Sequence, residues 1–276
     1  MTACTERAVL VAAHALDLAQ ERRCDRVYLG SETCELLIPT APQIRRFLQG
    51  TDGRTRLTVV TPPCTDEGLA RIERLLDALP AGTEVVFNDW GVLELLRAGF
   101  RPVMGRLLLT VRRGFRRGGL SRLAPEMTAF LRHSNLESPE LQAFLVESGV
   151  SRVELDNVVQ GLSLRLDPAF RASLYLPYVY IASGRKCLFQ RMATGSDEAY
   201  RSGAGCGLPC RDLSLWGVLG DPDERVLVSE NAHYYENAVL PADLEALNVD
   251  RIVDCSSLSR PARAGQAGEP GTREGM

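Results

Sequence analysis

The feature that most constrains the fold of this chain is an alternation of short strand-like segments with helix-like segments. Segments rich in β-branched and aromatic residues, typical of strands, occur at 26–30, 56–61, 84–88, 152–156, 174–182, 225–229 and 250–254. Amphipathic helical patterns lie at 5–21, 66–79, 91–98 and 139–148. Strands that alternate with helices favour right-handed βαβ units and a mostly parallel sheet. The pattern therefore predicts an α/β fold, either a TIM-barrel-like (β/α) barrel or, as the alternative, an open doubly wound sheet.

Two segments depart from this rhythm. Residues 110–125 contain Arg112, Arg113, Arg116 and Arg117 and predict an exposed basic loop. Residues 258–276 are rich in Arg, Gly, Pro and Ala without periodicity and predict a disordered tail. We therefore expect one barrel domain over residues 1–257, followed by that tail.

Composition excludes several classes of protein. A formal net charge of −3 over 276 residues argues against a generally basic nucleic-acid-binding protein. No apolar run approaches the roughly 18 residues of a membrane span, and Glu6, Arg7 and Asp17 make the N-terminus a poor signal peptide. We expect a cytoplasmic location. Eight cysteines in a reducing compartment then indicate metal binding, catalysis or packing instead of a disulfide framework.

Four of these cysteines share one kind of position. Cys34 and Cys187 each close a strand-like segment, and Cys206 and Cys210 follow in a Gly-rich turn. Thiols at the ends of parallel strands converge at the carboxyl edge of the sheet. Four thiolates from separate loops are what an iron–sulfur cluster needs. An all-cysteine zinc site and plain packing are the alternatives, because free cysteines are commonly buried as small apolar residues.

The other cysteines are expected to pack. Cys4 and Cys24 lie on or beside the first predicted helix, and Cys64 follows two prolines. Cys255 ends the last strand and is the one rival to Cys34 as a ligand.

Two carboxylates are candidates for proton transfer. Asp89 follows an apolar strand, where barrel enzymes place acids and bases, although it could equally be the N-cap of the helix that follows. Glu154 shares a strand face with Asp156, and a carboxylate that points into the barrel would have a raised pKa. A buried pair with an arginine is the alternative for Glu154. Arg185, beside Cys187, could hold an anionic substrate or balance the charge of a thiolate cluster.

Several motifs together resemble a known family. They are Val27-Tyr28-Leu29-Gly30 with Cys34, Asn88-Asp89-Trp90-Gly91, Pro102 to Leu108, Arg152 to Asn157 with Gln160-Gly161, Gly184-Arg185-Lys186-Cys187, and Cys206-Gly207-Leu208-Pro209-Cys210-Arg211. In this order the chain resembles the collagenase-like peptidases of unassigned mechanism (family U, number thirty-two). Within that family it is most similar to the UbiV-like proteins of oxygen-independent ubiquinone biosynthesis. The resemblance covers residues 8–255.

The resemblance implies a β/α barrel with a 4Fe-4S cluster on Cys34, Cys187, Cys206 and Cys210. It also implies a heterodimer with a UbiU-like paralogue, and an association with a lipid-carrier protein. Two departures stand out. The family opens with a strand where this chain begins at a predicted helix, so either the barrel lacks its first strand or the start is truncated. A Gly-Asn pair late in the family is Glu230-Asn231 here, which removes easy access to a positive φ.

The function implied is the oxygen-independent hydroxylation of an aromatic or quinone-precursor ring, with an organic hydroxyl donor such as prephenate. The residues provide no HExxH motif and no nucleophile paired with a base, so a peptidase is supported by the family name alone. A noncatalytic iron–sulfur subunit and an RNA-base hydroxylation factor remain alternatives.

Overall fold

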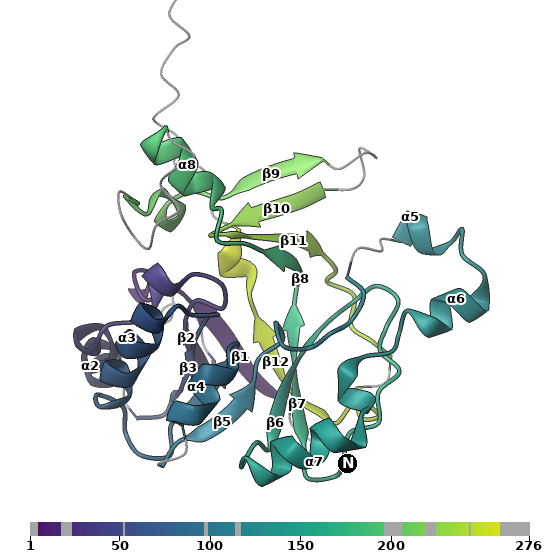
Figure 1. The fold of residues 1–276 in the computed structure, drawn as a ribbon, viewed down its shortest axis with the longest axis horizontal. Helices are drawn as coiled ribbons and strands as arrows, with labels where there is room; N and C mark the ends of the chain where they lie inside the picture. Colours follow the sequence, from purple (N-terminus) through teal and green to yellow (C-terminus); the bar gives the residue numbers. More distant parts are fainter. Residues whose placement is uncertain are drawn as a thin grey trace, which may run out of the picture.

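The architecture is a closed parallel barrel that carries a second, antiparallel sheet. The computed structural model describes residues 5–17, 24–51, 53–96, 99–113, 117–195, 206–218, 225–242 and 244–259. Within them, eight strands close the barrel in the order β1-β12-β7-β6-β5-β4-β3-β2 (Figure 1). Their bounds are β1 Glu6–Val11, β2 Arg26–Gly30, β3 Arg56–Val60, β4 Glu84–Phe87, β5 Arg101–Met104, β6 Arg152–Asp156, β7 Arg171–Leu176 and β12 Val249–Asp254. The predicted TIM-barrel-like α/β fold is confirmed.

The expectation of a helix from residue 5 and of a missing first strand is wrong. Residues 6–11 form β1, which pairs in parallel with both β2 and β12 and so closes the barrel. Ala8 to Val11 are all buried. A parallel strand covered on both faces is apolar at every position, so its hydrophobic pattern cannot be distinguished from that of a short buried helix.

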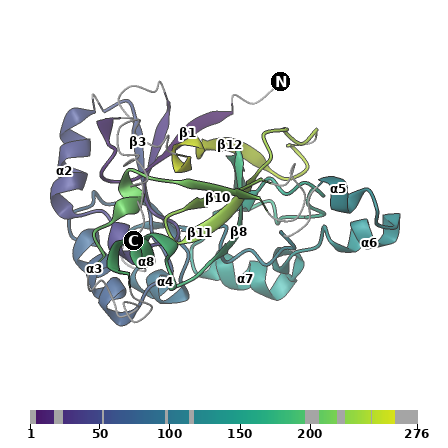
Figure 2. The same ribbon diagram turned by 90° about the horizontal axis from the view of Figure 1, so that it is seen from above.

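The four-stranded sheet lies at the carboxyl end of the barrel, across its mouth (Figures 1 and 2). Its order is β8-β11-β10-β9, with bounds β8 Tyr178–Ser183, β11 Ala232–Glu236, β10 Arg225–Ser229 and β9 Leu215–Val218. The single strand expected at 174–182 is thus two strands in two sheets, separated by Pro177. Proline has no amide hydrogen for the ladder, so the sequence held a breaker that the prediction overlooked.

Helices cover the outside of the barrel. Figures 1 and 2 show α2, α3 and α4 on one side and α7 on another. Their bounds are α2 Ala41–Gly50, α3 Asp66–Leu76, α4 Trp90–Leu95, α5 Arg117–Leu120, α6 Pro125–Phe130, α7 Pro139–Glu147 and α8 Leu188–Thr194, with short 3₁₀ turns η1 Glu35–Leu37, η2 Asn135–Glu137, η3 Pro209–Arg211 and η4 Ser256–Leu258. The helices predicted at 66–79, 91–98 and 139–148 correspond to α3, α4 and α7, whereas α2 was missed.

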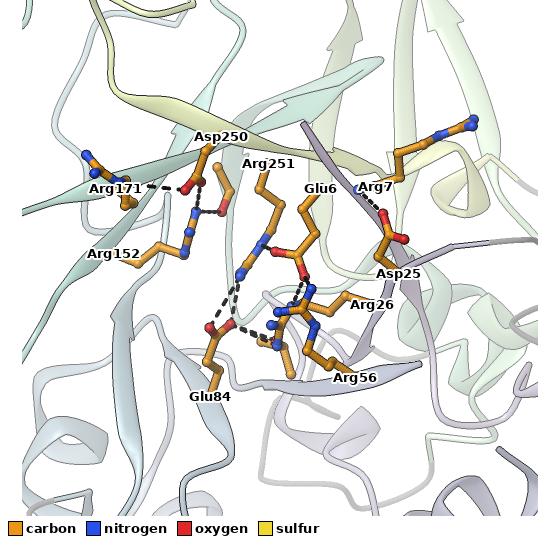
Figure 3. A network of polar contacts seen from close by, with 12 residues as sticks. Glu6, Arg7, Asp25, Arg26, Arg56, Glu84, Arg152, Arg171, Asp250 and Arg251 are labelled. Carbon is orange, nitrogen blue, oxygen red and sulfur yellow. Dashed lines mark hydrogen bonds and ion pairs between the residues drawn. The ribbon is translucent and has the colours of Figure 1, made fainter. Parts of the chain in front are cut away.

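The inside of the barrel is unusually polar at its amino-terminal end. Arg251 donates to Glu6 and to Glu84, and Arg26 donates to Glu6 and lies 3.2 Å from Glu84. Figure 3 shows these four side chains pointing toward one another. Since both arginines are almost fully buried, each charge depends on its partners to offset desolvation. This network closes the floor of the barrel.

Above this floor, aromatic and aliphatic side chains fill the interior. Tyr28 and Tyr175 meet edge to face with ring centroids 6.2 Å apart, and Val60, Val86, Val103 and Val253 pack with them. Alternate residues of the same strands face outward and join a separate core under the helices. The barrel interior is therefore a packed core.

Two smaller expectations have different outcomes. The segment 110–125 is not simply an exposed loop, because it includes α5, the start of α6, and Arg113, whose side chain is only 10% exposed and pairs with Asp156. Arg112 is exposed as expected, and Arg116 lies outside the described residues. The tail predicted from 258 also lies outside them from residue 260 onward. None of the helices in the described part of the chain has the length and apolarity needed to cross a membrane.

Candidate functional site

A cavity of about 830 Å³ lies at the carboxyl end of the barrel, beneath the second sheet. The loop after β2, the loop between β3 and α3, the loop between β8 and α8, the segment around η3 and the turn between β10 and β11 all contribute to its wall. Barrel enzymes build their active sites at this end. The sequence placed the candidate chemistry at the same edge.

All four predicted cysteines line this cavity. Cys34 precedes η1, Cys187 is the N-cap residue of α8, and Cys206 and Cys210 come from the segment around η3. Cys210 is buried, whereas the other three are half-buried. Three separate segments, of which the one with Cys34 is far from the other two in sequence, thus bring four thiols to one cavity.

The thiols are close enough to influence one another. Burial raises the pKa of Cys34, and the Glu230 carboxylate and the thiols of Cys210 and Cys187 raise it further. Burial also raises the pKa of Cys187, and Cys206 adds to that effect, while the backbone amides at the start of α8 oppose it. A pocket that disfavours thiolates in this way needs a positive partner before several thiols can ionise together.

Within the described residues, no group of three or more histidine, cysteine, aspartate or glutamate side chains is arranged to hold a metal ion. The expected metal centre on these cysteines stays a prediction. The donor set itself suits an iron–sulfur cluster, because it consists of soft sulfur donors. None of the three histidines lines the cavity.

The remaining described cysteines divide into two groups. Cys64 also lines the cavity, on the wall formed by the β3–α3 loop, where its thiol donates to the Pro62 carbonyl at 3.1 Å. Burial, with the nearby Asp89 and Glu35 carboxylates, raises the pKa of Cys64 to about 12. Sequence reasoning assigned Cys64 to packing and missed this position. Cys255 is fully buried in the barrel core and Cys24 packs against the outer core, so neither lines the cavity.

Asp89 lines the cavity and is also a helix N-cap, so both of its predicted roles are compatible with its position. One carboxylate oxygen accepts from the Gly91 amide at 2.8 Å, and the other accepts from the Cys64 amide at 3.0 Å. Glu35 stands on the same wall and accepts from the Thr65 amide and hydroxyl, both at 2.9 Å. Two carboxylates from the barrel loops therefore line the cavity.

Glu154 lies elsewhere, inside the barrel. It accepts a hydrogen bond of 2.9 Å from the Tyr28 hydroxyl, and its second carboxylate oxygen has no hydrogen-bond partner. Burial raises the pKa of Glu154 to about 7, although the charges of Arg251 and Arg152 oppose the increase. The expected inward orientation and raised pKa are present. However, Glu154 does not line the cavity, so it cannot touch a molecule bound there.

A buried ion network that sequence reasoning missed lies between the barrel core and the cavity. Arg106 is fully buried and donates to both oxygens of Glu32, at 2.9 and 2.6 Å, and to Asp156 at 2.9 Å. Its guanidinium also lies 4.1 Å from the centre of the Tyr175 ring. Asp156 receives a second bond, of 2.7 Å, from Arg113. Because Glu32 lies two residues before Cys34, this network supports the loop that carries that thiol.

The turn between β10 and β11 completes the wall. Glu230 has φ +55°, in the left-handed region that favours glycine. Residue 230 thus adopts a positive φ although it is not a glycine. Asn231 and the exposed Arg185 also line the cavity. Arg185 brings a positive charge to the mouth, which leaves both of its predicted roles open.

Comparisons with known proteins add no identification. The chain matches no protein-family model, no curated protein and no solved structure. The resemblance noted in the sequence therefore remains a hypothesis.

Proposed function

We propose that this protein binds a 4Fe-4S cluster through Cys34, Cys187, Cys206 and Cys210, and that it takes part in the oxygen-independent hydroxylation of an aromatic or quinone-precursor ring. The observation that carries the proposal is the presence of these four thiols, from three separate chain segments, in one cavity at the carboxyl end of a barrel. Four cysteine thiolates are the usual ligand set of such a cluster.

The electrostatics of the cavity define what a cluster would have to supply. Burial and neighbouring groups raise the pKa of Cys34 and Cys187, so the metal-free cavity favours neutral thiols, as packing alone would. Bound iron would supply the positive charge that lets them ionise. Each cysteine of a cubane binds a different iron. The four cysteine thiols of a cluster site consequently need not lie as close together as the ligands of a single metal ion.

The cavity could also bind a small substrate. Its whole volume, of which the cluster would take a part, is about 830 Å³ and falls within the usual range for small-molecule sites. Asp89 and Glu35 can accept hydrogen bonds from ring hydroxyls, and Arg185 can bind an acidic group at the mouth. When bound, the cluster would supply one-electron redox chemistry, and Asp89, which lines the same cavity, would move the proton. The partners we propose, from the resemblance, are a UbiU-like paralogue and a lipid-carrier protein.

The test of the cofactor is anaerobic purification followed by iron and sulfide analysis. We expect about four irons per chain and a broad absorbance near ~400 nm, as cysteine-ligated clusters show. Cys34→Ala, Cys187→Ala, Cys206→Ala and Cys210→Ala should each lose the cluster. Cys24→Ala, outside the cavity, is the matched control. If Cys34→Ala keeps its iron while Cys255→Ala or Cys64→Ala loses it, the ligand assignment is wrong.

The test of the reaction is quinone analysis of an anaerobic strain that lacks the native gene and carries a variant. Asp89→Asn should keep its iron, because asparagine also caps helices well, but should abolish ring hydroxylation. Normal quinone from this variant would remove Asp89 from the mechanism. Normal quinone in the strain without the gene would refute the pathway, and a protein that holds iron but is replaceable by its partner alone would be a noncatalytic subunit.

A further inference from the structure

The turn formed by Glu230 and Asn231 joins the two loops that carry Cys34 and Cys187. Ser229 and Ala232 are paired across the β10–β11 hairpin, so Glu230 and Asn231 are its two turn residues. Although it lies in a turn, Glu230 is only 3% exposed. A buried carboxylate at a hairpin tip is costly unless its oxygens are hydrogen-bonded.

Glu230 binds the Cys34 loop through two hydroxyl groups. The Ser31 hydroxyl donates to Glu230 Oε2, and the Thr33 hydroxyl donates to the same oxygen at 2.9 Å. Ser31 Oγ in turn accepts from the backbone amides of Thr33 and Cys34, at 3.2 and 3.0 Å. The carboxylate therefore fixes the hydroxyl that holds the backbone of Cys34.

The same turn holds the Cys187 loop. Asn231 Nδ2 donates to the Thr33 carbonyl at 2.8 Å and to the Gly184 carbonyl at 3.1 Å. The Gly184 amide donates back to the Asn231 carbonyl at 3.2 Å, and the Cys187 thiol donates to the Glu230 carbonyl at 3.6 Å. Both cysteine loops are thus attached to one dipeptide.

The backbone at residue 230 indicates that these contacts outweigh a local cost. A non-glycine residue in the left-handed region is strained, commonly by about 1–3 kcal/mol. Glycine would relieve that strain but would bring no carboxylate. A glutamate at φ +55° is therefore best explained by what its side chain holds.

From this geometry we propose that Glu230 is a positioning residue, which fixes the Cys34 loop against the Cys187 loop and keeps a negative charge beside the thiols. The proposal deepens the proposed function and rests on it for the consequence on the cluster. A carboxylate beside a thiolate-ligated cluster disfavours the addition of an electron, so Glu230 lowers the reduction potential of the bound cluster.

The backbone part is tested on the metal-free protein by hydrogen exchange of the peptide that contains Thr33 and Cys34. Glu230→Gly should speed exchange at these amides about tenfold or more, the factor that corresponds to one lost hydrogen bond to a charged group. Glu230→Gln keeps an acceptor oxygen and should exchange nearly as slowly as the wild type. Glu236→Gln, an exposed carboxylate on β11, is the matched control. Unchanged exchange in Glu230→Gly would overturn the proposal.

The charge part is tested by anaerobic redox titration of the iron-loaded protein. Glu230→Gln should keep its iron and its visible spectrum but shift the reduction potential upward, whereas Glu236→Gln should shift it much less. Equal potentials in wild type and Glu230→Gln would refute the electrostatic role. If the wild type binds no iron while exchange still responds to Glu230→Gly, the cluster is refuted and the positioning role stands.

Discussion

Replacement of Arg106 by methionine should destabilise the protein strongly, because it leaves a carboxylate buried without its charge partner. Arg106 is fully buried, and Glu32, its bidentate partner, is almost so. Asp156 would keep its bond to Arg113, so Glu32 is the group left without an ion pair. Breaking a buried pair from one side typically costs about 3–5 kcal/mol, a large share of the ~5–15 kcal/mol that stabilises most domains.

The assay is urea denaturation of the metal-free, reduced protein, followed by circular dichroism. The matched control is Arg46→Met, which removes the ion pair with Asp17, where the two side chains are 68% and 74% exposed. That surface pair should be worth about 0–1 kcal/mol. The double variant Arg106→Met with Glu32→Gln should recover part of the loss, because it no longer buries a charge.

The pH dependence gives a second check with a defined sign. Burial raises the pKa of Glu32, and Arg106 opposes that increase. Without Arg106 the folded-state pKa rises further above the unfolded value, so the folded state of the variant holds a proton that the unfolded state releases. The difference in unfolding free energy between wild type and Arg106→Met should therefore be smallest at acidic pH and should grow as the pH rises. A loss no greater than that of Arg46→Met at neutral pH would refute the reasoning.

Two further perturbations follow from the barrel interior. Burial raises the pKa of Glu154 to about 7. The protonated carboxyl group therefore stabilises the folded state fully at a pH below the unfolded-state pKa, and this stabilisation is lost as the pH rises through about 7. Glu154→Gln should thus flatten the fall in unfolding free energy between about pH 5 and 8, by up to ~3 kcal/mol, and an unchanged profile would contradict that pKa. Gly30→Ala should destabilise the protein by several kcal/mol or prevent folding. Gly30 has φ +137°, and an added Cβ would lie 2.3 Å from the Val60 carbonyl oxygen. Gly217→Ala, with open space around it, should be nearly neutral in the same urea denaturation assay.

The sequence predicted the fold class because most barrel strands have a recognisable local sequence pattern. Segments such as Arg56–Val60 and Arg152–Asp156 combine β-branched residues with flanking helices, and that alternation specifies a parallel sheet. The first strand was not predicted, because Ala8 to Val11 are apolar on both faces. The second sheet was not predicted either, since its hairpins pair segments whose pattern resembles that of barrel strands.

The convergence of Cys34 and Cys187 was predicted with a reason that holds for only one of them. Cys34 follows the barrel strand β2, where the carboxyl ends of parallel strands share one edge. Cys187 instead follows β8 of the antiparallel sheet, which the sequence did not predict. The contacts of Arg106 and Glu230 could not be predicted either, because they depend on which side chains cross the barrel and the hairpin. Glu230 was singled out in the sequence as a lost glycine, and only the structure shows the hydroxyl groups that its carboxylate binds.

The loop from Ser31 to Cys34 links these separate features. Below it, Glu32 is held by Arg106 in the barrel. Above it, Ser31 and Thr33 are held by Glu230 in the second sheet. The position of Cys34 is thus set by two elements that are distant in sequence, and each can be removed separately. If Arg106→Met and Glu230→Gly act on one rigid loop, the two should be non-additive in the exchange rate of the Cys34 amide. Additive effects would show that Arg106 and Glu230 hold Cys34 independently.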